Sequence, residues 1–353
     1  MINFVVEVFT LLSVSLFVIL LRTYARWSTV GFREFCPDDY LILLAGAVFI
    51  GEAVTAYPFA AQSRALSNCC MTPEEREAVI PGSPEHHFRV MGSKVQLAGW
   101  TEYTTILWLS KLCMAFSYFR LTPGLLYIMR RIKFGIALIC VTYVAAIFSS
   151  FMSCLPIEKN WQIYPDPGNF CQPAISKVRV YVVAILNVVT DLYIMMIMLP
   201  LIWKAKLRIS KKIFLFILFG GGIFIITASI VRAVVILNSP KTGTLQAGLW
   251  ACRESFVAIV VTNLPPIYPQ IRRLTRRWNL GSLFSAPSGH GDTTTGRNYP
   301  LNSRSYSRSR KRDSKDPNAP YVPNTAAYDS DERIVLDMNT NHSAFNRTEP
   351  LPP

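Results

Sequence analysis

The chain has 353 residues, of which 51% are hydrophobic and 16% charged, whereas a soluble domain is usually about a quarter charged. This composition excludes an ordinary soluble domain. The formal net charge of +14 is common among nucleic-acid-binding proteins, but here most of the excess lies in short segments beside apolar runs. Basic residues in that position face anionic lipid headgroups, so the expected partner is the lipid bilayer and not nucleic acid.

Apolar runs of about 20 residues recur along the chain, which is the length that a helix needs to cross the hydrocarbon core of a membrane. The alternation typical of a membrane barrel is missing, so we expect helices to satisfy the backbone in lipid. The sequence therefore predicts an all-α membrane protein, a bundle of seven transmembrane helices. The predicted spans are residues 2–21, 39–57, 97–119, 134–154, 178–203, 213–237 and 248–269.

The distribution of Lys and Arg between the connections predicts the orientation of the spans. The first, third and fifth connections, residues 22–33, 120–133 and 204–212, are the basic ones. We therefore expect the N-terminus outside and the C-terminus in the cytoplasm, with the plasma membrane as the expected location and an internal membrane as the alternative. The third span is the least hydrophobic because it contains Glu102 and Lys111, and without it both termini would lie on one side.

Four of the eight cysteines fall on the predicted outer side, where an oxidising environment favours disulfides. Cys154 and Cys171 bracket the loop CLPIEKNWQIYPDPGNFC, and a disulfide between them would hold this loop over the mouth of the bundle. Cys69 and Cys70 lie in the preceding outer connection, and spacing alone does not fix which cysteines pair. No histidine accompanies them at ligand spacing, so we expect no metal site.

Several ionisable residues lie inside the predicted spans, where a charge is costly and usually faces a partner or a water-filled cavity. Lys111 and Asp191 lie at similar depths and are expected to form an ion pair. A shallower layer near the outer ends contains Glu52, Glu102, Arg232 and Glu254. These charges either hold the helices together or line a polar cavity for a ligand.

The chain changes character at its C-terminal end. Residues 1–277 form the predicted membrane domain, whereas residues 278–353 are rich in Ser, Asn, Pro and charge and poor in large apolar residues, which is typical of a disordered cytoplasmic tail. Serines beside arginines there are candidate phosphorylation sites, because a phosphate would cancel local positive charge. They are Ser303, Ser305, Ser307 and Ser309. The alternative is an inert solvated tail.

Several motifs along the chain resemble those of one family, the fungal rhodopsin-domain integral membrane proteins. They are LRTYARW, CPDDYLILLA, LSKLCMAFSYFRLTP, CLPIEKNW with its second cysteine, MLPLIWK, SIVRAVVI and WACRESFVAIVVTNLPPIYP. The resemblance covers roughly residues 5 to 275. It implies a seven-span fold and receptor-like roles, since the family includes proteins of plant-pathogenic fungi linked to surface sensing through G proteins, and a member from a trichothecene-toxin gene cluster.

The word rhodopsin raises the question of a retinal cofactor. A retinal Schiff base requires a lysine in the last span, and residues 248–269 contain none. Lys111 is the only lysine deep in any predicted span. We therefore expect no cofactor and no retinal.

These observations favour a G-protein-coupled-receptor-like sensor of an extracellular or surface cue, with an unidentified ligand and a heterotrimeric G protein as partners. One alternative is a membrane-embedded enzyme of a secondary-metabolite pathway, similar to a cyclase, in which Glu102, Asp191 and Glu254 would act as acids. The nearby lysine and arginines oppose the raised pKa that such an acid needs, so we do not expect an enzyme. A transporter is the other alternative, but the sequence lacks the internal repeat common in transporters.

Overall fold

The computed structural model describes residues 2–61, 66–121, 126–204, 209–238 and 240–277. By its internal contacts the chain divides into two units, residues 1–287 and 288–353, and every described residue belongs to the first unit. The predicted tail and its candidate phosphorylation sites lie outside the described residues.

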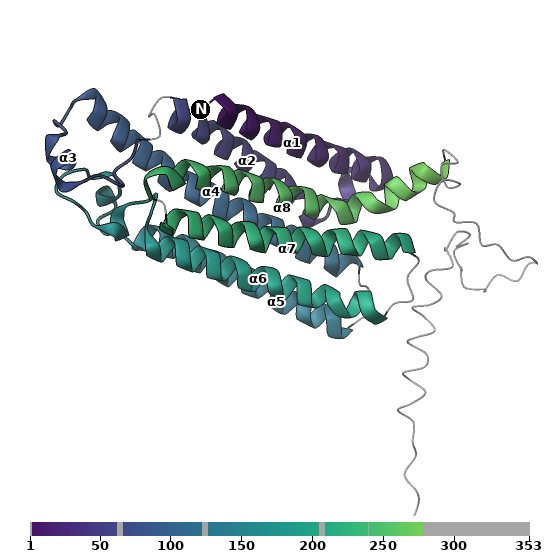
Figure 1. Cartoon of the computed structure of the whole chain (residues 1–353). Helices are drawn as coiled ribbons and strands as arrows, with labels where there is room; N and C mark the ends of the chain where they lie inside the picture. Colours follow the sequence, from purple (N-terminus) through teal and green to yellow (C-terminus); the bar gives the residue numbers. More distant parts are fainter. Residues whose placement is uncertain (1, 62–65, 122–125, 205–208, 239, 278–353) are drawn as a thin grey trace, which may run out of the picture. The chain divides into compact units, whose positions relative to one another are not determined.

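All regular elements in the described ranges are helical, as the sequence predicts (Figure 1). The α-helices are α1 (Ile2–Val30), α2 (Pro37–Ala61), α3 (Pro73–Ala78), α4 (Pro84–Leu121), α5 (Leu126–Met152), α6 (Lys177–Lys204), α7 (Ile209–Asn238) and α8 (Pro240–Arg277). Three short 3₁₀ helices lie between them, at Phe32–Glu34, Ile157–Trp161 and Asn169–Cys171.

Five of the helices, α1, α2, α5, α6 and α7, are long and apolar enough to cross a membrane. The chain is therefore a multi-pass membrane protein. The two longest helices, α4 and α8, have 38 residues each and carry more polar residues. They pack against these five: α4 against α2, α5 and α6, and α8 against α7 and α1. The predicted count of seven spans depends on α4 and α8 and remains a prediction, as does the orientation of the termini.

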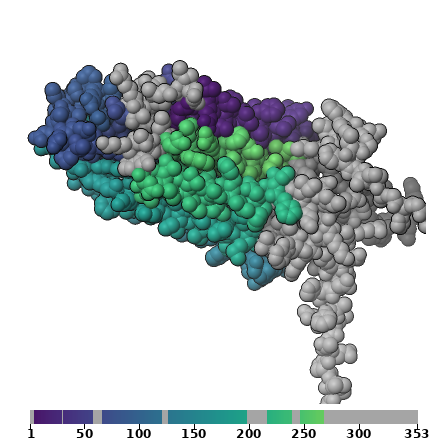
Figure 2. Space-filling view, viewed as in Figure 1, coloured from purple at the N-terminus to yellow at the C-terminus, as the bar shows by residue number. Residues whose placement is uncertain are grey.

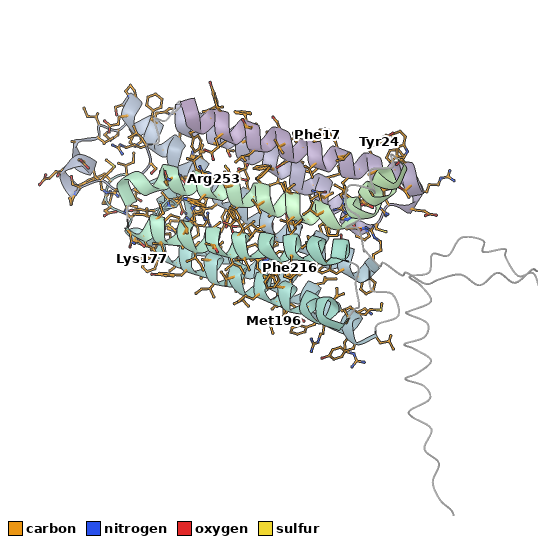
Figure 3. The ribbon with its side chains drawn as sticks, turned by 45° about the vertical axis from the view of Figure 1, so that its right-hand side comes forward. Phe17, Tyr24, Lys177, Met196, Phe216 and Arg253 are labelled. Atoms are coloured by element: carbon orange, nitrogen blue, oxygen red, sulfur yellow. A yellow bond between two sulfur atoms is a disulfide. The ribbon has the colours of Figure 1, made fainter. Side chains whose placement is uncertain are left out.

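The outward faces of the apolar helices carry large hydrophobic side chains, which suits contact with lipid. Phe17 and Met196 are each 66% exposed, and Figure 3 labels them together with Tyr24 and Phe216, which are also exposed. Figure 2 shows one such face, on which side chains of α1, α7 and α8 lie at the surface. The polar residues that a soluble protein would place here are instead buried between the helices.

Close packing between helices depends on small residues at a few positions. A Cβ atom at Gly221 of α7 would overlap the side chain of Val261 of α8, whereas one at Gly220 would meet nothing within 4 Å. Glycines at such contacts let helix backbones approach closely, which is a main source of helix association in lipid. Gly221 therefore sets how near α7 and α8 can lie.

One end of the bundle carries α3 and residues 153–176, and we call it the loop end (Figure 1). Its loops are held by buried hydrogen bonds between segments far apart in sequence. The Asn68 amide donates to the carbonyl oxygens of Asn160 and Cys171, and the Arg76 guanidinium donates to that of Ile163. The two connections of the loop end are thus joined into one structure over the bundle.

Candidate functional site

The side chain of Lys111, on α4, is buried among acceptors that all come from α6. Its Nζ lies 3.0 Å from Asp191 Oδ1 and donates hydrogen bonds to Asn187 Oδ1 at 2.6 Å and to Thr190 Oγ1 at 2.7 Å. The structure thus brings together the two residues that the sequence predicts as a pair. An ammonium has three donors, so these contacts satisfy the charge fully inside the bundle.

The pair is linked to Glu254, a fully buried residue of α8. Asn187 Nδ2 donates to Glu254 Oε1 at 2.9 Å, and the Tyr103 hydroxyl donates to Glu254 Oε2 at 2.8 Å. Hydrogen bonds therefore run without a break from Tyr103 through Glu254 and Asn187 to Lys111. We call Tyr103, Lys111, Asn187, Asp191 and Glu254 the buried network; it joins α4, α6 and α8.

The sequence places Lys111 and Glu254 in separate layers and does not identify Asn187 or Tyr103, which join them. Uncharged polar and aromatic residues occur both inside and outside such bundles, so neither stands out by type. A signal for Asn187 does exist: it precedes Asp191 by four residues, so both lie on the same face of one helix.

Arg232 of α7 lies above the network, toward the loop end. It is 5% exposed, and its Cζ lies 3.8 Å from the ring centre of Tyr103 and 4.4 Å from that of Trp100. Among the described residues no carboxylate lies within 4.0 Å of it, and its Nε is buried without a hydrogen-bond partner. The structure thus does not pair Arg232 directly with Glu254, one of the three acids predicted in its layer.

The two remaining predicted acids each face a neighbouring helix through a hydroxyl group. Glu102 Oε2, on α4, accepts a hydrogen bond from Thr55 Oγ1 of α2 at 2.7 Å. Glu52 Oε2, on α2, accepts one from Ser255 Oγ of α8 at 3.1 Å. These contacts tie α2 to α4 and α8 beside Arg232.

A cavity of about 90 Å³ opens between α2, α4, α7 and α8 at the loop-end side of the network. Arg232, Trp100 and Glu52 line it, and Ala174 closes it from the loop between the disulfide and α6. A second cavity, of about 60 Å³, adjoins Lys111 and Asp191 deeper in the bundle. The buried network therefore connects one cavity to the other.

The opposite end of the bundle contains a buried ionic cluster that the sequence analysis does not identify. Arg22 Nη2 of α1 lies 2.7 Å from Asp38 Oδ2 and 3.3 Å from Asp39 Oδ1, both on the first turn of α2. Arg120 of α4 lies 3.2 Å from Asp38, and Arg26 lies 3.3 Å from Asp39. Basic residues at the ends of spans are interpreted as signals of membrane orientation. Their ion pairs with buried acids are therefore not predicted from the sequence.

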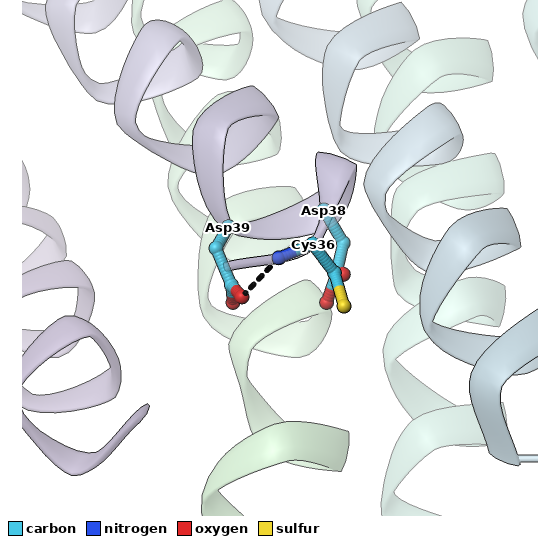
Figure 4. A group of neighbouring side chains, drawn as sticks. All are labelled: Cys36, Asp38 and Asp39. Atoms are coloured by element: carbon cyan, nitrogen blue, oxygen red, sulfur yellow. Dashed lines mark hydrogen bonds between the residues drawn. The ribbon is translucent and has the colours of Figure 1, made fainter. Parts of the chain in front are cut away.

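Figure 4 shows Cys36, Asp38 and Asp39, whose ligand atoms lie within 4.8 Å of one another. Such a group could in principle hold a metal ion. The two carboxylates, however, already face the guanidinium groups of Arg22, Arg26 and Arg120. A cation would meet that positive charge, so the donor set does not fit a metal.

Cys154 and Cys171 form a disulfide in the structure, and Ala174, which lines the cavity, lies three residues after this bond. The pairing is the one that the sequence analysis favours. It fixes both ends of the loop, because Cys154 follows α5 and Cys171 precedes α6.

Cys69 lies in the loop-end connection beside Cys70. The Cys70 thiol donates a hydrogen bond to Cys69 Sγ at 2.9 Å and lowers the pKa of Cys69 from 9.0 to about 7, against the opposing effect of burial. The Ser67 hydroxyl and the guanidinium groups of Arg76 and Arg89 act in the same direction as Cys70. A lowered pKa favours the thiolate, which is the reactive form of a cysteine.

Residues 21–273 match the family described as the fungal rhodopsin domain. A relative from Emericella nidulans, described as a SAT4 family membrane protein, is 28% identical over 100 residues, or 28% of this chain and 25% of the relative. The chain thus spans about a quarter of the length of that relative. Every residue of the buried network lies within the matched range.

Proposed function

This chain belongs to the fungal rhodopsin domain family, and we propose that it is a seven-span, receptor-like sensor that binds an external cue at its loop end. In this proposal α4 and α8 complete the seven spans, and the loop end faces the outside of the plasma membrane. The basic residues Arg22, Arg26 and Arg120 support that orientation, since they lie at the opposite end. The Cys154–Cys171 disulfide supports it too, because disulfides persist on the oxidising side of a membrane.

The observation that carries the proposal is the unbroken hydrogen-bond chain between the loop-end cavity and the Lys111–Asp191 pair. Tyr103 lines that cavity and bonds to Glu254, and Lys111 lines the deeper one. Buried polar contacts exist in a few discrete arrangements, so a group that binds beside Tyr103 can change the contacts between α4, α6 and α8. A sensor needs such a link between its outer site and its helices.

The end of the bundle opposite the cavity supplies the surface for a G protein in this proposal. There Arg120, on the last turn of α4, is bound to Asp38 of α2. A shift of α4 that began at Tyr103 would act directly on this ion pair. The basic connections beside it would then contact the G protein.

An enzyme that uses Glu254 as its acid has less support than a sensor. A carboxyl group that acts as an acid catalyst needs a free oxygen facing its substrate. Both oxygens of Glu254 instead accept hydrogen bonds from fixed side chains, Tyr103 and Asn187.

The proposal is tested in a fungal strain that lacks the gene and carries it back in variant form. We expect the wild-type chain to restore the rise in cyclic AMP after a surface or nutrient stimulus. Glu254→Gln should reduce that rise by more than half, because an amide cannot accept both buried hydrogen bonds as a carboxylate does. Arg253→Gln is the matched control, since Arg253 is half-buried outside the network and contacts Glu7 and the ring of Trp250 (Figure 3).

Both variants must reach the membrane at wild-type levels. If deletion of the gene leaves the cyclic AMP response unchanged, the sensor proposal is wrong. If Glu254→Gln and Arg253→Gln respond alike, the network does not carry the signal.

A further inference from the structure

We propose that the loop-end cavity binds a small organic carboxylate through the guanidinium group of Arg232. This inference rests on the proposed function and names the chemical class of its ligand. The starting point is the juxtaposition, in one cavity, of a buried arginine and a mostly apolar wall.

Arg232 is a buried cation whose hydrogen-bonding capacity is left open. A guanidinium has five N–H donors, and the Nε of Arg232 is buried with no hydrogen-bond partner among the described residues. The rings of Trp100 and Tyr103 stabilise its charge from one side, but ring faces accept no in-plane hydrogen bonds. A buried charge without acceptors is costly, so the site is built for a group that supplies them.

The geometry of the donor favours a carboxylate among anions. The planar guanidinium matches a carboxylate with two parallel hydrogen bonds. A phosphate with two negative charges would bring one more than Arg232 can balance.

The other residues that line the cavity indicate the polarity and the size of the part of the ligand beyond its carboxylate. Phe4, Trp100, Ile236 and Ala247 line it with apolar surface, which suits an aliphatic chain. Its volume of about 90 Å³ is well below the roughly 300 Å³ of the smallest usual sites for drug-sized ligands. A carboxylate with a chain of a few carbons therefore fits the cavity.

A cationic ligand is the main competitor, because the acid Glu52 also lines the cavity. Glu52, however, already has a partner, since it accepts a hydrogen bond from Ser255. An ammonium would also meet Arg232 in the same space. The group of the cavity with an unused hydrogen-bond donor is therefore Arg232, and not Glu52.

The test uses the purified full-length chain in detergent and three probes that share one carbon chain: butyrate, butylammonium and 1-butanol. At constant ionic strength, we expect butyrate alone to raise the melting temperature in a saturable way. Arg232→Gln should weaken butyrate binding at least tenfold, whereas Arg253→Gln, half-buried near the same end, should leave it unchanged.

If Arg232→Gln does not fold, Ala247→Leu decides the matter, because it fills the cavity and leaves Arg232 in place. That variant should also lose the butyrate effect. The proposal is overturned if butylammonium or butanol stabilises as well as butyrate, if butyrate binds both variants normally, or if no probe binds and water alone fills the cavity. Cells that respond to the stimulus while butyrate fails to bind would overturn this inference and leave the sensor standing; the reverse would overturn the sensor alone.

Discussion

Lys111 carries its charge into the middle of the bundle, and α6 supplies every acceptor that surrounds it among the described residues. Moving an ammonium from water into such a place is costly, and attraction to Asp191 repays the cost only while both partners are present. Asp191 Oδ2 has no hydrogen-bond partner among the described residues, so this carboxylate depends on Lys111 more than Lys111 depends on it. The pair therefore links α4 to α6 only while both charges are present.

This asymmetry leads to a prediction about the pair. Lys111→Met should destabilise the chain by about 3–5 kcal/mol, the usual effect of leaving a buried charge unpaired. Lys111→Met combined with Asp191→Leu should recover much of that loss, since no charge is then left without a partner. Thermal unfolding in one detergent measures both.

The control for this prediction is Lys177→Met, because Lys177 is exposed at the start of α6 (Figure 3). It should melt within a degree or two of the wild type. A double variant that is no more stable than Lys111→Met would show that the ion pair is not what Lys111 contributes.

At the scale of the elements, α7 and α8 depend on a close approach at Gly221. A Cβ there overlaps the branched side chain of Val261, whose χ1 rotation is strongly restricted in a helix. We expect Gly221→Ala to lower the melting temperature and to weaken butyrate stabilisation, because Arg232 on α7 and Ala247 on α8 would be forced apart. Thermal unfolding with and without butyrate measures both effects.

Gly220→Ala is the matched control for this prediction. A Cβ at Gly220 meets nothing within 4 Å, and alanine favours a helix over glycine by about 1 kcal/mol. This variant should be as stable as the wild type or slightly more stable. Equal losses in both variants would mean that α7 itself, and not its contact with α8, is sensitive.

At the scale of the whole molecule, hydropathy was enough to predict the helical class and the five strongly apolar helices. It placed the start of the third span at residue 97, whereas α4 begins at Pro84, because the extra turns are polar and carry no apolar run. Those turns support the loop end. Sequence patterns find segments that lipid surrounds, and they do not find a helix that continues beyond the membrane.

The same limit applies to the candidate site. Lys111 and Asp191 were predictable because isolated charges in apolar runs stand out, and their depth follows from position along the chain. Depth does not give rotation about the helix axis, so the link through Asn187 and the separation of Arg232 from Glu254 could not be predicted. The Arg22–Asp38 pair was missed for another reason. A basic residue at the end of a span can either signal the orientation of the span or pair with an acid, and the sequence does not distinguish the two roles.

The number of spans is the remaining property of the whole molecule, and it depends on α4, the helix that carries Glu102 and Lys111. Seven spans put the termini on opposite sides of the membrane, and six put them on the same side. We expect a tag before Ile2 to be stained on intact cells whose walls have been removed, and a tag after Pro353 to be stained only after the membrane is permeabilised. A soluble cytoplasmic protein, unstained in intact cells, controls for leakage. Staining of both tags without permeabilisation, or of neither, would contradict the seven-span bundle and remove the outer position of the cavity with it.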